Sequence, residues 1–446
     1  MLDNHDPGLA MNTTSPARTR SASDTGPLPS ATSAMDVPGS CGSASFSDFI
    51  ATGKTHSESI DEMLEFLSVF DARVIRFDVD AHIDRAILLP SNTTVYVDNC
   101  TIWQNDDVFD NVFRSANVRD LPSDDYAEMI AAHDKTPWTG YYEKLPSEIP
   151  ELENIRILGL GKARIVGPQT NAVINNPVKG EDSLVGDAYG YRTQQIHIAK
   201  TNHAEVGDLD FARTRCWCVS FELSSDIHVH GLRIESHTTQ GDGVDIRMGC
   251  RKVEIRDIEA FTSDDSIACT CLPHFDPWRR DPASPKMFCC ESTRNARGKM
   301  KLEEAHIADV HISDIVTDAR AEVAHGVILL AALGGQVHHV SIDNVRECGR
   351  GMERESVIKV FTGYGDGYRP GDLHHIRVNN VTSEKARSAF QCNTHVADVR
   401  VNRIIQHAAG HSTLRPRLRI AALDAKYIED IAFSNVEGGI VNNYGQ

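Results

Sequence analysis

The chemistry open to this chain is indicated by three carboxylates, one imidazole and one ammonium group, each at the end of a short strand-like run. They belong to Asp242, Asp264, Asp265, His325 and Lys359. Cleavage of a glycosidic bond needs one carboxyl group that protonates the leaving oxygen and a second that activates water. The five side chains are therefore a candidate set for acid–base hydrolysis, provided that the fold brings them together.

The spacing of the aspartates suggests how they meet. Asp242 precedes Asp264 by 22 residues, close to one coil of a solenoid, where stacked residues lie about 4.8 Å apart. Adjacent strand residues point to opposite faces, so Asp264 and Asp265 share a site only at an irregular strand end. Mutual repulsion would then raise the pKa of one carboxyl and leave it protonated as the acid. The alternative for any single aspartate is a turn former that bonds its own backbone.

A repeat along the chain indicates the elements that must position these residues. Each copy has a polar residue, alternating apolar positions and a small polar turn, and the copies begin at Asn154, Asp226, Lys252, Asp309, His339, His375, Asp398 and Asp430. Alternation with period two predicts strands with one buried face, and copies about one coil apart predict stacking. We therefore expect an all-β fold, a single-stranded right-handed parallel β-helix.

The steps between copies are 72, 26, 57, 30, 36, 23 and 32 residues. The steps of 72 and 57 residues correspond to two coils each, or to one coil with an insertion. An antiparallel sandwich is the alternative fold, but it would show hairpin dipeptides such as Asn-Gly between paired strands, and these are nearly absent.

The ends and the middle of the chain differ from the repeat. Residues 1–44 are rich in Ser, Thr and Pro and predict a disordered tail ahead of a catalytic β-helix domain over 45–446. Apolar residues at helical spacing predict a short helix over 57–70 that caps the solenoid. Residues 270–304 form an insertion, which we expect to be a loop or lid.

Composition limits the partners. The 446 residues include 45 basic and 63 acidic ones, a formal net charge of −18. This charge argues against nucleic acid and anionic membranes, which both bind basic surfaces. No apolar stretch is long enough to span a membrane. The N-terminus has no apolar core of a secretory signal, so we expect a cytoplasmic protein, with secretion by another route as the alternative. The oligomeric state is not predicted.

The eleven cysteines are scattered, which is typical of reduced thiols. A cluster in and beside the insertion could hold structural zinc, with Cys269, Cys271, His274, Cys289 and Cys290 as ligands. Vicinal cysteines fit the usual paired Cys-x₂-Cys spacing poorly. We therefore expect a lid closed by ordinary packing, with no metal and no cofactor.

In four places the chain resembles the polygalacturonase-type enzymes, glycoside hydrolase family 28 of the pectin-lyase-like β-helix superfamily. The family motifs run Asn-Thr-Asp-Gly, Asp-Asp, Gly-His-Gly and Arg-Ile-Lys. The matching segments, in the same order, are Gln240-Gly241-Asp242-Gly243, Asp264-Asp265, Ala324-His325-Gly326 and Val357-Ile358-Lys359. Segments 51–55 and 89–95 resemble the family's entry segment and first coil, so the resemblance covers roughly 45–440.

The resemblance implies a glycoside hydrolase that inverts the anomeric centre and acts on a carbohydrate. Asp264 would be the general acid, while Asp242 and Asp265 would hold and deprotonate water. His325 would assist them, and Gln240 and Lys359 would bind the substrate.

Val357 replaces the arginine that helps the family to hold the substrate, so we expect a pectin-like or other uronate-containing glycan, or a neutral one. A polysaccharide lyase or a transglycosylase on the same fold is the alternative enzyme. A carbohydrate-binding β-helix of tailspike or adhesin type is the alternative without catalysis.

Overall fold

The computed structural model divides the chain into two units, Met1–Gly39 and Ser40–Gln446. The residues that it describes are 39–106, 108, 110–118, 149–168, 173–176, 181–184, 194–214, 217–238, 241–272, 301–332, 334–362, 371–392, 394, 396–407, 418–420, 429–437 and 440–442. Nearly all of the predicted tail, most of the insertion over 270–304 and Gln240 lie outside these residues.

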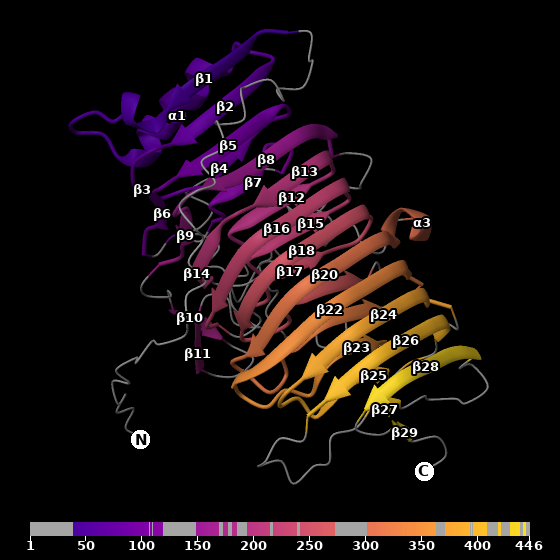
Figure 1. Cartoon of the computed structure of the whole chain (residues 1–446). Coiled ribbons are helices and arrows are strands. Elements are labelled where there is room, and N and C mark those ends of the chain that lie inside the picture. The colour runs from indigo at the N-terminus through magenta and orange to yellow at the C-terminus, as the bar shows by residue number, and fades with distance from the viewer. Residues whose placement is uncertain are drawn as a thin grey trace, which may run out of the picture. The chain divides into compact units, whose positions relative to one another are not determined.

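Most described residues belong to two parallel sheets (Figure 1). Sheet A runs through β1 (Cys41–Ser45), β2 (Ala72–Phe77), β5 (Thr93–Asp98), β8 (Leu152–Leu160), β13 (Thr201–Gly207), β16 (Ser225–Ser236), β18 (Arg251–Thr262), β20 (Ile307–Ala319), β22 (Val337–Gly351), β24 (Leu373–Ser383), β26 (Val396–Gln406) and β28 (Glu429–Glu437). It also includes β3 (Ala81–Ile83), β6 (Thr101–Gln104), β9 (Arg164–Val166) and β14 (Asp210–Thr214).

Sheet B runs through β4 (Ile87–Leu89), β7 (Phe113–Ser115), β12 (Ile196–Ala199), β15 (Val219–Glu222), β17 (Val244–Ile246), β19 (Ile267–Cys271), β21 (His325–Ala331), β23 (Ser356–Phe361), β25 (Ser388–Cys392), β27 (Leu418–Ile420) and β29 (Ile440–Asn442). One antiparallel pair, β10 (Val173–Asn176) with β11 (Glu181–Leu184), stands apart from both sheets. Successive coils add one strand to each sheet in turn, so the predicted parallel β-helix is confirmed.

The register explains the two long steps of the repeat. Strand β13 pairs with β8 on one side and β16 on the other, so a coil around His203 lies between the copies at Asn154 and Asp226. Strand β18 pairs directly with β20, so the step from Lys252 to Asp309 is one coil that carries the insertion. The 72-residue step is therefore two coils and the 57-residue step is one.

The polar ends of each repeat are corners of the backbone. Seven successive coils hold two residues with positive φ, five positions apart: His203 and Asp208, Asp226 and Gly231, Lys252 and Asp257, Asp309 and Asp314, His339 and Asn344, His375 and Asn380, Asp398 and Arg403. Residues without a β-branch, Asn and Asp above all, tolerate this left-handed conformation best. Each corner shifts the in–out alternation and bends the strand, as a β-bulge does. Side chains also bond from coil to coil, since Asn344 Nδ2 donates to Asp314 Oδ1 at 3.0 Å.

The apolar residues between corners fill one continuous core; Ile255, Ile312 and Ile342, for example, stack in successive coils. The predicted capping helix is present as α1 (His56–Leu67), which packs beside β1 and β3 (Figure 1). Its N-cap Thr55 and Glu58 form a capping box, and the helix buries Ile60, Met63 and Leu67.

Within the described residues, two shorter helical segments accompany α1, namely the 3-10 turn η2 (Phe46–Asp48) and α3 (Leu302–Ala305). Strand β1 begins at Cys41, so β structure starts inside the segment 1–44 predicted as a tail.

Candidate active site

The register of sheet B brings two of the predicted aspartates to equivalent positions in neighbouring coils. Val244 of β17 pairs with Ile267 of β19, and the Gly243 amide donates to the Asp265 carbonyl at 2.8 Å. Asp242 therefore stacks on Asp265, 23 positions later, rather than on Asp264. Both precede the first residue of their strand, and both are buried. Neighbouring strands lie about 4.8 Å apart, so the backbones of the two residues are stacked in adjacent coils.

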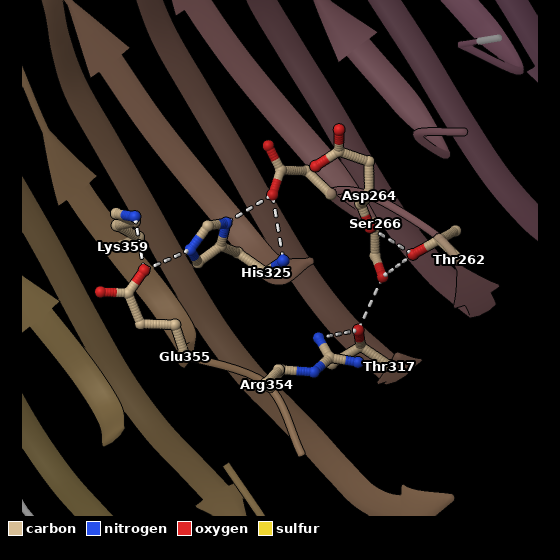
Figure 2. Close-up of polar contacts among 9 residues, drawn as sticks. Thr262, Asp264, Ser266, Thr317, His325, Arg354, Glu355 and Lys359 are labelled. Atoms are coloured by element: carbon tan, nitrogen blue, oxygen red, sulfur yellow. Dashed lines mark hydrogen bonds and ion pairs between the residues drawn. The ribbon is translucent and has the colours of Figure 1, made fainter. Parts of the chain in front are cut away.

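His325 continues this column in the next coil. Its backbone amide and its Nδ1 both donate to Asp265 Oδ1, at 3.0 and 2.7 Å (Figure 2). Burial by itself would lower the pKa of His325, but the carboxylates of Asp265 and Glu355 outweigh it and raise the pKa above its ordinary value. The imidazole is held in one orientation with a proton toward Asp265.

Glycines make the column compact. A Cβ on Gly243 would lie 2.3 Å from the Ser266 carbonyl oxygen, and one on Gly326 would lie 2.7 Å from the Val357 carbonyl oxygen. Only a residue without a Cβ allows the strands to approach so closely directly after Asp242 and His325. The glycine that follows each of these residues is thus explained by packing.

Glu355 is a site residue that the sequence analysis missed. Its Oε2 accepts a hydrogen bond from Lys359 Nζ at 2.9 Å and lies 3.6 Å from His325 Nε2, an ion-pair contact (Figure 2). Its Oε1 accepts from Gln391 Nε2 at 2.8 Å. The pKa of Glu355 is held well below its ordinary value, first by His325 and then, against the opposing effect of burial, by Gln391 and Lys359. Glu355 thus connects the predicted imidazole to the predicted ammonium.

Asp264 lies beside this column but is less buried than Asp242 and Asp265. The Thr262 hydroxyl donates to its backbone carbonyl at 2.7 Å. That hydroxyl also lies 3.1 Å from Ser266 Oγ, which is 2.7 Å from Thr317 Oγ1. This chain of hydroxyl groups fixes the irregular turn between Asp264 and Asp265 (Figure 2).

The family's arginine has no replacement from this motif. Val357 is fully buried in the core. Arg354 is 1% exposed and donates from Nη1 to Thr317 Oγ1 at 2.9 Å. Burial lowers the pKa of Arg354 to about 10 although Glu347, Asp318 and Asp265 oppose the shift. Arg354 is therefore a buried residue that bonds to Thr317, and its guanidinium is not accessible to a substrate.

Metal-binding groups of three or more His, Cys, Asp or Glu are absent from the described part of the chain. Cys269 and Cys271 are buried thiols of β19, and burial raises the pKa of Cys271 to about 12. The other candidate zinc ligands, His274, Cys289 and Cys290, lie outside the described residues. Within the same described ranges, no helix has the length and apolar character of a membrane span.

No family model and no curated protein sequence matches the chain. Among solved structures it is similar to a hyperthermoactive exopolygalacturonase from Thermotoga maritima, with 16% identity, 90% of this chain and 91% of that chain covered, and a TM-score of 0.48. It is similar to an endo-xylogalacturonan hydrolase from Aspergillus tubingensis, with 12% identity, 90% and 94% covered, and a TM-score of 0.42.

A tailspike protein of the E. coli bacteriophage HK620 in complex with a pentasaccharide is also similar, with 11% identity, 84% of this chain and 65% of that chain covered, and a TM-score of 0.49. The chain is thus similar to polygalacturonase-type enzymes and to tailspike proteins, the two groups that the sequence analysis named. At these identities and TM-scores, the choice of a reaction depends on the geometry of the site.

Proposed function

We propose that the chain is an inverting glycoside hydrolase that cleaves a glycosidic bond in a polysaccharide or oligosaccharide. The observation that carries the proposal is the column of Asp242, Asp265 and His325 at the start of three successive strands of sheet B. Asp242 and Asp265 in neighbouring coils, with Asp264 beside them, would supply the acid and the base that hydrolysis needs.

The roles follow from the surroundings of each carboxyl group. Asp265 accepts two hydrogen bonds from His325, which hold its carboxylate in a fixed position. From that position it would accept the proton of the attacking water. Asp242, stacked on it, helps to hold that water. Asp264 is the least buried of the three and is the proposed general acid, because the acid must reach the leaving oxygen of a bound glycan. Water attacks opposite to the leaving group, so the anomer inverts.

The test is Asp264→Asn, with reducing-end release measured on a panel of glycans. The amide cannot donate the proton, so turnover should fall by about 10²–10⁴-fold with the fold intact. Asp314→Asn is the matched control, since Asn344 and Asn380 occupy the same corner in the next coils, and it should keep full activity.

Proton NMR of the first product should show the inverted anomer. A retained anomer would contradict the assignment of Asp242 and Asp265 to water. An unsaturated product would favour the lyase. Glycan binding without any bond cleavage would favour the tailspike-like alternative.

A further inference from the structure

The Glu355 carboxylate already has the partners that a bound acidic group would take. Both of its oxygens accept hydrogen bonds, from Gln391 Nε2 at 2.8 Å and from Lys359 Nζ at 2.9 Å. His325 Nε2 lies 3.6 Å from the second oxygen. A carboxylate that meets one ammonium, one imidazole and one amide occupies a complete anion site.

The cations of this region are therefore engaged within the protein. The Lys359 ammonium contacts Glu355 and lies 4.8 Å from the centre of the Phe361 ring. Arg354 is buried and donates to Thr317. Val357 stands where the resembled enzymes carry a second cation, and its side chain lies in the core. The cation that the motif keeps is thus the buried Lys359, and Glu355 pairs with it.

We propose that Glu355 is a built-in carboxylate that fills the anion position of the site, so that the sugar bound beside Lys359 and His325 is uncharged. The inference rests on the proposed function for the reaction but concerns the substrate class.

A sugar carboxylate brought to this position would meet a like charge and donors that are already used. A neutral sugar needs only hydrogen bonds to the outer atoms of the same groups. Glu355 therefore selects by repulsion, and its removal should admit an acidic sugar.

The test measures binding and needs no turnover. D-galacturonate, D-galactose and acetate are titrated into the full-length wild type and into Glu355→Ala, and the ring of His325 is followed by NMR. Wild type should bind galactose in preference to galacturonate. Glu355→Ala should bind galacturonate about 10–100-fold more tightly than wild type does, the gain expected for one charge-assisted hydrogen bond.

Two further readouts separate this role from a structural one. Glu355→Ala should lower the pKa of His325, because one of the carboxylates that raises it is lost, and acetate should restore that pKa. Glu355→Gln keeps the volume of the side chain, lowers the pKa in the same way, and serves if the alanine variant does not fold. Glu353→Gln is the matched control, since Glu353 pairs with Arg387 at 3.0 Å, and it should behave as wild type.

Wild type that binds galacturonate as tightly as Glu355→Ala does would overturn the inference. So would a folded Glu355→Ala protein that binds neither acetate nor galacturonate. If these binding results hold while Asp264→Asn leaves turnover unchanged, the reaction assigned above fails and the anion position stands.

Discussion

The close backbone approach at Gly326, directly after His325, makes Gly326→Ala a direct test of the strand spacing at the site. The added Cβ would lie 2.7 Å from the Val357 carbonyl oxygen, 0.7 Å less than the 3.4 Å at which ordinary contact begins, and 2.9 Å from Thr317 Cγ2. Overpacking of this kind costs about 1–3 kcal/mol, and the stiffer unfolded chain returns about 0.4–1 kcal/mol. We expect a net loss of about 1–2 kcal/mol in the free energy of unfolding.

The assay is urea unfolding followed by tryptophan fluorescence, with kcat measured in parallel. Activity should fall by more than the change in stability implies, because His325 precedes Gly326 and a displacement near 1 Å can cost about 100-fold. Thr317→Ser removes one of the two close contacts and keeps the hydroxyl. It should therefore cost less in the Gly326→Ala background than in wild type. A Gly326→Ala protein with the stability and kcat of wild type would refute the strand spacing on which the site depends.

The remaining predictions concern pH and the corners. The raised pKa of His325 means that its ion pairs stabilise the fold fully below about pH 6.5 and less as the pH rises through the folded-state pKa. The difference in Tm between wild type and His325→Gln should shrink from pH 6 to pH 9, and a constant difference would contradict the pairing. Asn344 has φ +56, so Asn344→Val should lower the free energy of unfolding by about 1–2 kcal/mol. Asn344→Gly should change it much less, and equal urea midpoints for both variants would count against the corner.

The fold could be predicted because its signal is local. Alternation with period two and polar corners recur in most coils, and each copy specifies its own strand. The coil around His203 was not recognised as a copy of the repeat. Its buried positions are Ala204 and Val206, a weaker apolar signal than the Ile and Val pairs of the other coils.

The site was only partly predictable because it depends on register between coils. Asp242 aligns with Asp265 and not with Asp264, a one-residue difference that spacing alone cannot decide. Glu355 meets His325 only because Ser356 pairs with His325 across β21 and β23. Its one local signal was a carboxylate directly before a buried strand, where a charge needs a partner.

The paired corners also bear on how such a protein can change. Five positions separate the two corners in seven coils, although the coils themselves differ in length from 23 to 57 residues. In the two longest of these coils, the long connections follow the ends of the sheet B strands β19 and β23, between Cys271 and Ile307 and between Phe361 and Leu373. Selection can lengthen or replace those connections without disturbing a corner or a core position. A coil can therefore gain residues while its corners and its core positions keep their spacing.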